Sequence, residues 1–93
     1  MMKFNVLVSD VAQRQIYEIE EKTKHRLIKT LRELEKNSFK TRSGADIKKL
    51  KGSRNPSLYR LRVGEFRIIY SVNKKEVRVT EIMKRSKGYE WID

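Results

Sequence analysis

The sequence predicts one α+β domain over residues 1–93, in the order β-α-α-β-β-β, with two helices packed on one face of an antiparallel sheet. Three observations support this prediction. Apolar and polar residues alternate in four short stretches, which is typical of half-buried strands. Two stretches between the first and second of these carry apolar residues at helical spacing. The connections are short, and helices that precede a run of antiparallel strands are typical of an α+β sandwich.

The N-terminal part is expected to form a strand over Lys3–Val8 and two helices. Ser9 or Asp10 is suited to cap the first helix, because short polar side chains accept hydrogen bonds from the first-turn amides. Thr23 is suited to cap the second helix. No glycine or proline separates the helices, so one long helix is the alternative. The apolar stripes expected to face the core are Val11, Ala12, Ile16 and Ile19, then Leu27, Ile28, Leu31 and Leu34.

A basic connector follows from Asn37 to Ser57. A short helical turn is expected in it from Ser43 through Leu50, with turns at the glycine and proline that come later. The last strand is expected from Val77 to about Met83. Because regular alternation would turn Glu81 toward the core, we expect a bulge or a strand end near this residue.

The stretch LYRLRVGEFRIIY, Leu58–Tyr70, is typical of a β-hairpin. A type II′ turn at Gly64-Glu65 fixes the register, so that Arg62 faces Arg67. One face of the hairpin is apolar, and it carries Tyr59, Leu61, Val63, Phe66, Ile68 and Tyr70. The other face is expected to stay open, and it carries Arg60, Arg62, Arg67 and, from the last strand, Arg78. Like charges directly opposite each other are destabilising, so an anion is expected there.

The charge distribution indicates a polyanion as the partner. The chain carries 23 Lys and Arg against 12 Asp and Glu, a net charge of +11. Residues 40–67 hold nine basic and two acidic side chains, so most of the excess lies in this segment. A concentrated positive field favours nucleic acid, because binding releases condensed counterions. A solvated basic face, or a docking site for an acidic protein, is the alternative.

Several classes of protein are excluded or disfavoured by the residues. The absence of cysteine excludes disulfides and Cys-based zinc sites, and we expect a cytoplasmic protein. No apolar run has the length of a signal peptide or a membrane span. No metal-ligand spacing, nucleophile elbow or glycine-rich phosphate loop is present, so no cofactor or metal is expected. Any catalysis must therefore come from arginine, lysine and tyrosine.

The candidate site residues follow from this chemistry. Arginine suits phosphate recognition because its planar group donates hydrogen bonds in pairs and stays charged. A tyrosine among cations ionises more readily, and an exposed ring stacks on an unpaired base. Tyr89 in the C-terminal tail is the tyrosine that fits these two roles. The alternative is that Tyr89 and Trp91 cover the end of the core. The lysines and arginine that extend the positive surface are Lys48, Lys49, Lys51, Lys84, Arg85 and Lys87.

Three segments together resemble the RelE/ParE toxin superfamily of type II toxin–antitoxin systems. They are LKG at Leu50–Gly52, YRLRVGEFRIIY at Tyr59–Tyr70, and KRSKGY at Lys84–Tyr89. Resemblance to the RelE branch implies that the protein is an mRNA interferase, which cuts messenger RNA in the ribosomal A site without a metal. It also implies a cognate antitoxin, acidic and partly disordered, that forms a hetero-oligomeric complex with the toxin.

The resemblance assigns roles residue by residue. Arg67 matches the phosphate-binding arginine after the hairpin turn, Arg85 the second arginine, and Tyr89 the C-terminal tyrosine that stacks on or activates the attacked nucleotide. Arg60 and Arg62 stand where well-studied members have lysines, which implies phosphate clamps rather than proton donors. Lys84 stands where many relatives have histidine.

The implied reaction is attack of a ribose 2′-OH on the adjacent phosphate, with Arg62 and Arg67 stabilising the charge. Tyr89 is expected to serve as base or stacking partner and Arg85 to act on the leaving-group side. The alternatives are a ParE-like inhibitor of DNA gyrase, a non-catalytic nucleic-acid-binding module, and an interaction domain for an acidic protein.

Overall fold

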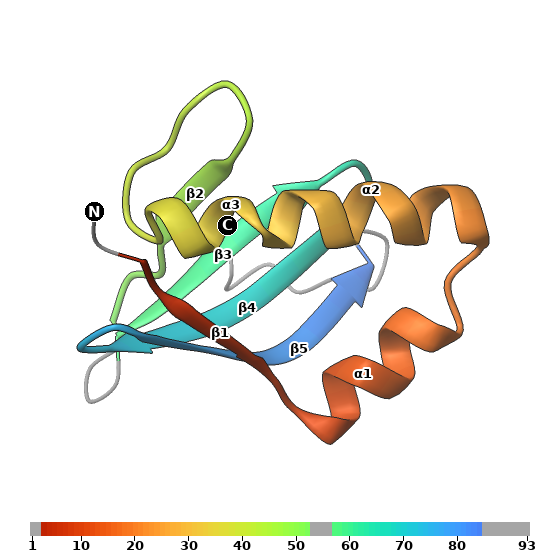
Figure 1. Cartoon of the computed structure of the whole chain (residues 1–93), viewed down its shortest axis with the longest axis horizontal. Coiled ribbons are helices and arrows are strands. Elements are labelled where there is room, and N and C mark those ends of the chain that lie inside the picture. Colours follow the sequence, from red (N-terminus) through yellow and green to blue (C-terminus); the bar gives the residue numbers. More distant parts are fainter. Residues whose placement is uncertain (1–2, 53–56, 85–93) are drawn as a thin grey trace.

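The computed structural model describes residues 3–52 and 57–84, which form one five-stranded sheet with helices across one face (Figure 1). The strand order is β1-β5-β4-β3-β2. In chain order the elements are β1 (Asn5–Val8), α1 (Asp10–Tyr17), α2 (Glu21–Leu31), α3 (Glu33–Lys36), β2 (Asp46–Lys49), β3 (Leu58–Val63), β4 (Phe66–Asn73) and β5 (Glu76–Lys84). The predicted α+β class is confirmed. No helix in these two ranges is long and apolar enough to cross a membrane.

The sheet is mixed, so the prediction of a purely antiparallel sheet was wrong. β1 runs parallel to β5, with Asn5 opposite Glu76 and Val8 opposite Val79. The other three pairings are antiparallel. Alternation of apolar residues identifies a strand, but it does not show which strand lies beside it. The neighbour depends on the edge of the sheet to which the helices return the chain. Here they return it to the far edge, and successive reversals then bring β5 beside β1.

The helical turn predicted for Ser43–Leu50 was also wrong, because this stretch contains the edge strand β2. It pairs with β3 and places Asp46 opposite Arg62 and Lys49 opposite Tyr59. Only one of its four side chains, Ile47, is buried. One inward residue gives too short an alternation to be recognised in the sequence, so pairing with β3 decides the conformation.

The helices form as two separate segments, with a short third one after them. Ser9 caps α1, and its hydroxyl accepts a hydrogen bond from the amide of Ala12 at 3.1 Å. The chain leaves helical geometry after α1, and Glu20 rather than Thr23 is the N-cap of α2. The alternative of one long helix is therefore wrong. The break forms without glycine or proline, because the junction consists of Glu18, Ile19 and Glu20, and the side chain of Ile19 packs against the core.

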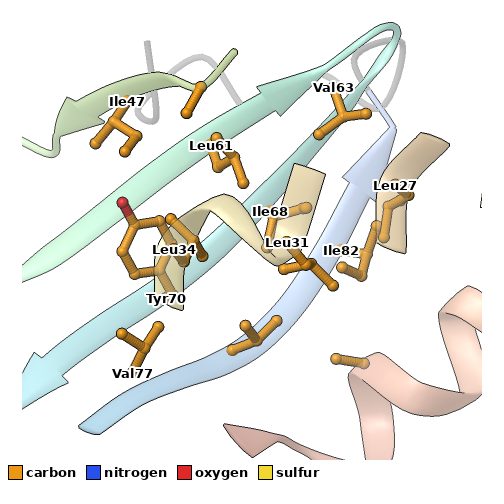
Figure 2. Close-up of a cluster of buried hydrophobic side chains, with 13 residues drawn as sticks. Leu27, Leu31, Leu34, Ile47, Leu61, Val63, Ile68, Tyr70, Val77 and Ile82 are labelled. Atoms are coloured by element: carbon orange, nitrogen blue, oxygen red, sulfur yellow. The ribbon is translucent and has the colours of Figure 1, made fainter. Parts of the chain in front are cut away.

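The main core lies between the helices and the sheet. Side chains from α2 and α3 meet those of β2, β3, β4 and β5 there (Figure 2). The labelled members are Leu27, Leu31, Leu34, Ile47, Leu61, Val63, Ile68, Tyr70, Val77 and Ile82. Two residues that were expected in the helical stripes, Val11 and Ile28, are instead 54% and 41% exposed. Each is an exposed apolar side chain, one on α1 and one on α2.

The β3–β4 hairpin has the predicted register. Val63 lies opposite Phe66, and Arg62 lies opposite Arg67. Gly64 has a φ angle of 58°, as expected for glycine at the first position of a type II′ turn. The two faces of the hairpin therefore carry the side chains that the alternation assigned to them.

The predicted bulge near Glu81 is confirmed. Tyr70 lies opposite Val79 while Ile69 lies opposite Glu81, so Thr80 is the extra residue on β5. One inserted residue reverses the alternation of the strand beyond it. The reversal turns Glu81 away from the core and brings the side chain of Ile82 into it.

The buried phenol of Tyr70 links the sheet to the segment after α3. Its hydroxyl donates a hydrogen bond to the carbonyl of Ser38 at 2.7 Å. Burial raises the pKa of Tyr70 well above its usual value, so the phenol stays neutral in the folded protein.

We predict that Tyr70→Phe lowers the free energy of unfolding by about 1–2 kcal/mol at neutral pH, because the carbonyl of Ser38 loses its donor. The raised pKa adds a dependence on pH. Stability should fall as pH rises above about 10, where the unfolded chain binds fewer protons at this residue than the native state does. Urea unfolding of both proteins across this range measures the effect. An equal alkaline loss in the variant would contradict the prediction.

Candidate nucleic-acid interface

The sheet face away from the helices, called the arginine face below, carries Arg60, Arg62 and Arg67. The prediction that it stays open was wrong for two of them, because Arg60 and Arg67 are each 7% exposed. A second apolar cluster lies on this face. It consists of Leu50, Ile69 and Met83, with Leu58 packed against it. Cross-strand pairing brings these apolar residues beside the arginines, and their packing accounts for part of the burial.

Near the hairpin turn, cross-strand pairing places four side chains in one row. From β5 to β2 the row is Met83, Arg67, Arg62 and Asp46. Residues directly opposite each other point to the same side of a sheet, with β-carbons roughly 4.5–5.5 Å apart. The positive charge of Arg62 thus lies between a like charge and a carboxylate.

Asp46 was not predicted as a site residue, and it is bound to Arg60. A guanidinium nitrogen of Arg60 (Nη1) donates to Asp46 Oδ1 at 3.1 Å and to its carbonyl at 3.2 Å. The Arg60 side chain is 9% exposed and that of Asp46 is 51% exposed. A buried guanidinium requires such an acceptor. No sequence pattern indicated this pair, because β2 had not been recognised as the neighbour of β3.

Arg62 differs from Arg60 in its hydrogen bonding. Its Nε atom is buried and makes no hydrogen bond to any group that the structure describes. Leaving a buried charged donor unsatisfied is costly, whereas an anionic oxygen would satisfy it. The local chemistry of Arg62 therefore favours a phosphate as ligand.

The remaining basic candidates are divided between the two faces. Lys48 lies opposite Arg60 on the arginine face. Arg78 lies there too, and its Nε donates to Glu76 Oε1 at 2.6 Å. Lys49 and Lys84 lie on the helix-covered side, since their partners across the sheet are Tyr59 and Phe66. Lys51 is exposed in the turn after β2, and the candidates Arg85, Lys87 and Tyr89 lie outside the described residues.

The largest groove that the described residues are shown to form lies away from Arg60, Arg62 and Arg67. A groove of about 610 Å³ lies where the α1–α2 junction faces the hairpin turn and the end of β5. Four glutamates are among the residues that line it, namely Glu18, Glu20, Glu65 and Glu81, together with Lys84. Within residues 3–52 and 57–84, no group of three or more His, Cys, Asp or Glu side chains could hold a metal ion. The arginines that neighbour one another on the arginine face suit an extended polyanion.

We predict that Asp46→Ala has opposite effects on stability and binding. Loss of the carboxylate's hydrogen bond to Arg60, with the bond to the backbone carbonyl kept, should lower the free energy of unfolding by about 1 kcal/mol. Loss of a negative charge from the arginine face should tighten binding of a single-stranded oligonucleotide at low salt. Thermal unfolding and fluorescence anisotropy measure the two effects. Asp10→Ala makes the same charge change on α1, and tighter binding by this control alone would contradict the assignment.

Comparison with known proteins places this fold among toxins. The family model for the ParE toxin of the type II toxin–antitoxin system parDE matches residues 6–89. A search of curated proteins gives no match. Among solved structures, the chain is similar to one in the archaeal RelE–RelB complex from Pyrococcus horikoshii OT3, with 26% identity and a TM-score of 0.78. That match covers 94% of this chain and 100% of the other.

Two further structures share the fold. One is the RelB–RelE antitoxin–toxin complex from Methanococcus jannaschii, with 25% identity, a TM-score of 0.70, and coverage of 94% of this chain and 99% of that one. The other is the YoeB dimer from Staphylococcus aureus, with 19% identity, a TM-score of 0.65, and coverage of 85% and 93%. With the family model spanning nearly its whole length, this chain belongs to the ParE toxin family and is a toxin–antitoxin toxin of the RelE/ParE superfamily.

Proposed function

We propose that this toxin is a ribosome-dependent endoribonuclease that cuts mRNA in the A site and thereby inhibits translation. The observation that carries the proposal is the pair Arg62 and Arg67 on the arginine face, with a buried Arg62 Nε that lacks an acceptor among the described residues. Similarity to the RelE chain of Pyrococcus horikoshii supports the same conclusion. The scissile phosphate is the anion that this pair would bind.

The reaction starts with attack of a ribose 2′-OH on the adjacent phosphorus. The bond from phosphorus to the 5′-oxygen of the next nucleotide breaks, and a 2′,3′-cyclic phosphate and a 5′-hydroxyl remain. The 2′-OH loses a proton and the departing 5′-oxygen gains one. Arg62 and Arg67 stabilise the charge of the pentavalent phosphorane, as fixed donors do in many enzymes. Arginine has too high a pKa to move protons near neutral pH.

The proton transfers therefore belong to the C-terminal segment and the ribosome. Tyr89 serves as base or as stacking partner of the attacked nucleotide, and Arg85 acts on the leaving-group side. Weak acid–base groups make the enzyme slow on free RNA. The ribosome contributes by holding the 2′-OH in line with the bond that breaks, and such positioning can supply a large part of a rate enhancement.

A cognate antitoxin is the second partner in this proposal. The two RelE structures that resemble this chain are complexes with RelB. An acidic, partly disordered antitoxin would neutralise the arginine face of a chain with a net charge of +11. It would also cover the exposed apolar side of the helices, where Val11 and Ile28 lie.

A ParE-like inhibitor of DNA gyrase is the second candidate function, and the match to the ParE family model favours it. This function needs the same fold but no RNA cleavage. A supercoiling assay with purified gyrase separates the two candidates. Inhibition of supercoiling by a toxin that leaves ribosome-bound mRNA intact would replace the proposed function with this one.

We predict that Arg67→Ala, Arg85→Ala and Tyr89→Phe each lower mRNA cleavage on translating ribosomes, with a loss of about 100-fold for Arg67→Ala, which removes a charge-stabilising donor. Primer extension on the cut mRNA measures the rate. Arg14→Ala, at an exposed position of α1, is the matched control and should cut normally. Unchanged cleavage in all three variants would overturn the site assignment.

A further inference from the structure

Four aromatic rings form a ladder at one end of the helix-covered sheet face. The Phe39 ring lies edge-on to Phe4 at 5.7 Å and to Tyr59 at 5.6 Å between centroids. Tyr59 in turn stacks on Tyr70 at 5.6 Å. Tyr70 is fully buried, and its hydroxyl donates a hydrogen bond to the carbonyl of Ser38, the residue before Phe39. Phe39 itself is 50% exposed, so the ladder presents this ring to solvent.

The loop that carries Phe39 is fixed by polar contacts. Asn37 Oδ1 accepts hydrogen bonds from the amides of Phe39 at 2.9 Å and Lys40 at 3.0 Å. Arg42 Nη1 donates to the carbonyls of Asn37 at 3.1 Å and Lys40 at 2.6 Å. An exposed ring that is already held in place loses little conformational entropy when it binds a ligand. The loop therefore has the properties of a preformed contact surface.

Lysines gather at the end of the sheet that carries this ring. Lys3 precedes Phe4, Lys40 follows Phe39, and Lys49 lies opposite Tyr59. The start of β1 and the β4–β5 turn lie at the same end of the sheet (Figure 1). The exposed lysines at this end are Lys3, Lys40, Lys49, Lys51, Lys74 and Lys75. A nearby carboxylate, on Glu33, is already bound by Lys36 and Arg42. An exposed ring among cations suits a ligand with both phosphates and flat bases.

Strand β2 connects this ring to the arginine face. It forms one edge of the sheet, and its neighbouring lysines point to opposite faces. Lys48 lies opposite Arg60 on the arginine face, and Lys49 lies opposite Tyr59 on the aromatic side. Tyr59 and Arg62 are three residues apart on β3, which corresponds to roughly 10 Å. A polyanion that leaves the arginine face across β2 thus reaches Phe39 within a few nucleotides.

We propose that Phe39 is a base-stacking platform for single-stranded RNA that crosses the β2 edge from the arginine face. The inference rests on the proposed function, because it names a further contact for the same RNA. Aromatic side chains stack on any base, so the platform adds affinity without sequence preference. Phosphates on either side of the stacked base lie against Lys49 and Lys40.

The test uses a 12-nucleotide RNA with 2′-O-methyl groups, which cannot be cut, and polyphosphate of equal charge. Phe39→Ala should weaken binding of the RNA about tenfold, as loss of one stacking contact does. Binding of polyphosphate should change little. Tyr17→Ala is the matched control, because Tyr17 is 81% exposed and lies beside Lys24 Nζ at 5.2 Å from its ring. This control should bind the RNA normally.

A spectroscopic signal tests stacking directly. In a Trp91→Phe background, Phe39→Trp introduces one indole, whose fluorescence should be quenched by the RNA but not by polyphosphate. This variant keeps a ring in the ladder, so it decides the question even if Phe39→Ala unfolds. Absence of quenching, or equal quenching by polyphosphate, overturns the proposal. So does a loss of antitoxin binding by Phe39→Ala with RNA affinity intact, which would assign the ring to a protein partner.

Failure of the proposed nuclease is a separate result, because the oligonucleotide test involves no cleavage. RNA binding that depends on Phe39, in a toxin that leaves ribosomal mRNA intact, supports the platform and contradicts the nuclease. Normal cleavage together with RNA binding that is unchanged in Phe39→Ala supports the nuclease and contradicts the platform.

Discussion

The register between β3 and β4 determines which side chains face the helices and which face away. Gly64, with its φ of 58°, permits the two-residue turn that sets this register. A slip by one residue would move Leu61 and Ile68 out of the core and drive arginines into it. The separate pairings of β2 with β3 and of β5 with β4 then extend the row, with Asp46 opposite Arg62 and Met83 opposite Arg67. The juxtaposition of Arg62 and Arg67 in the candidate site thus follows from one turn.

The arginine face combines stabilising and destabilising contacts. Asp46 satisfies the guanidinium of Arg60, and apolar neighbours such as Met83 cover part of the sheet. Arg62, by contrast, faces Arg67 and keeps a buried Nε without an acceptor among the described groups. Features that reduce stability at a binding surface are common where a ligand compensates for them. Function and stability therefore place opposite demands on this hairpin.

Local features of the fold could be predicted because a few residues determine each of them. The cap at Ser9 and the bulge before Glu81 follow from side chains close in sequence. Strand β2 could not be predicted, because Ile47 is its one buried residue. The parallel placement of β1 depends on the path of the whole chain. The burial of the arginine face has a signal in the sequence, because alternation places the apolar Ile69 there and the bulge before Glu81 adds Met83.

The central claim, that Arg62 is held ready for a phosphate, is tested most directly by thermal unfolding of Arg62→Met at low salt. Removal of the charge and of the buried donor should leave the variant at least as stable as the wild type without anions. Added inorganic phosphate should then raise the melting temperature of the wild type, and of an Arg14→Met control, more than that of Arg62→Met. A variant that is less stable than the wild type and responds equally to phosphate would contradict the claim.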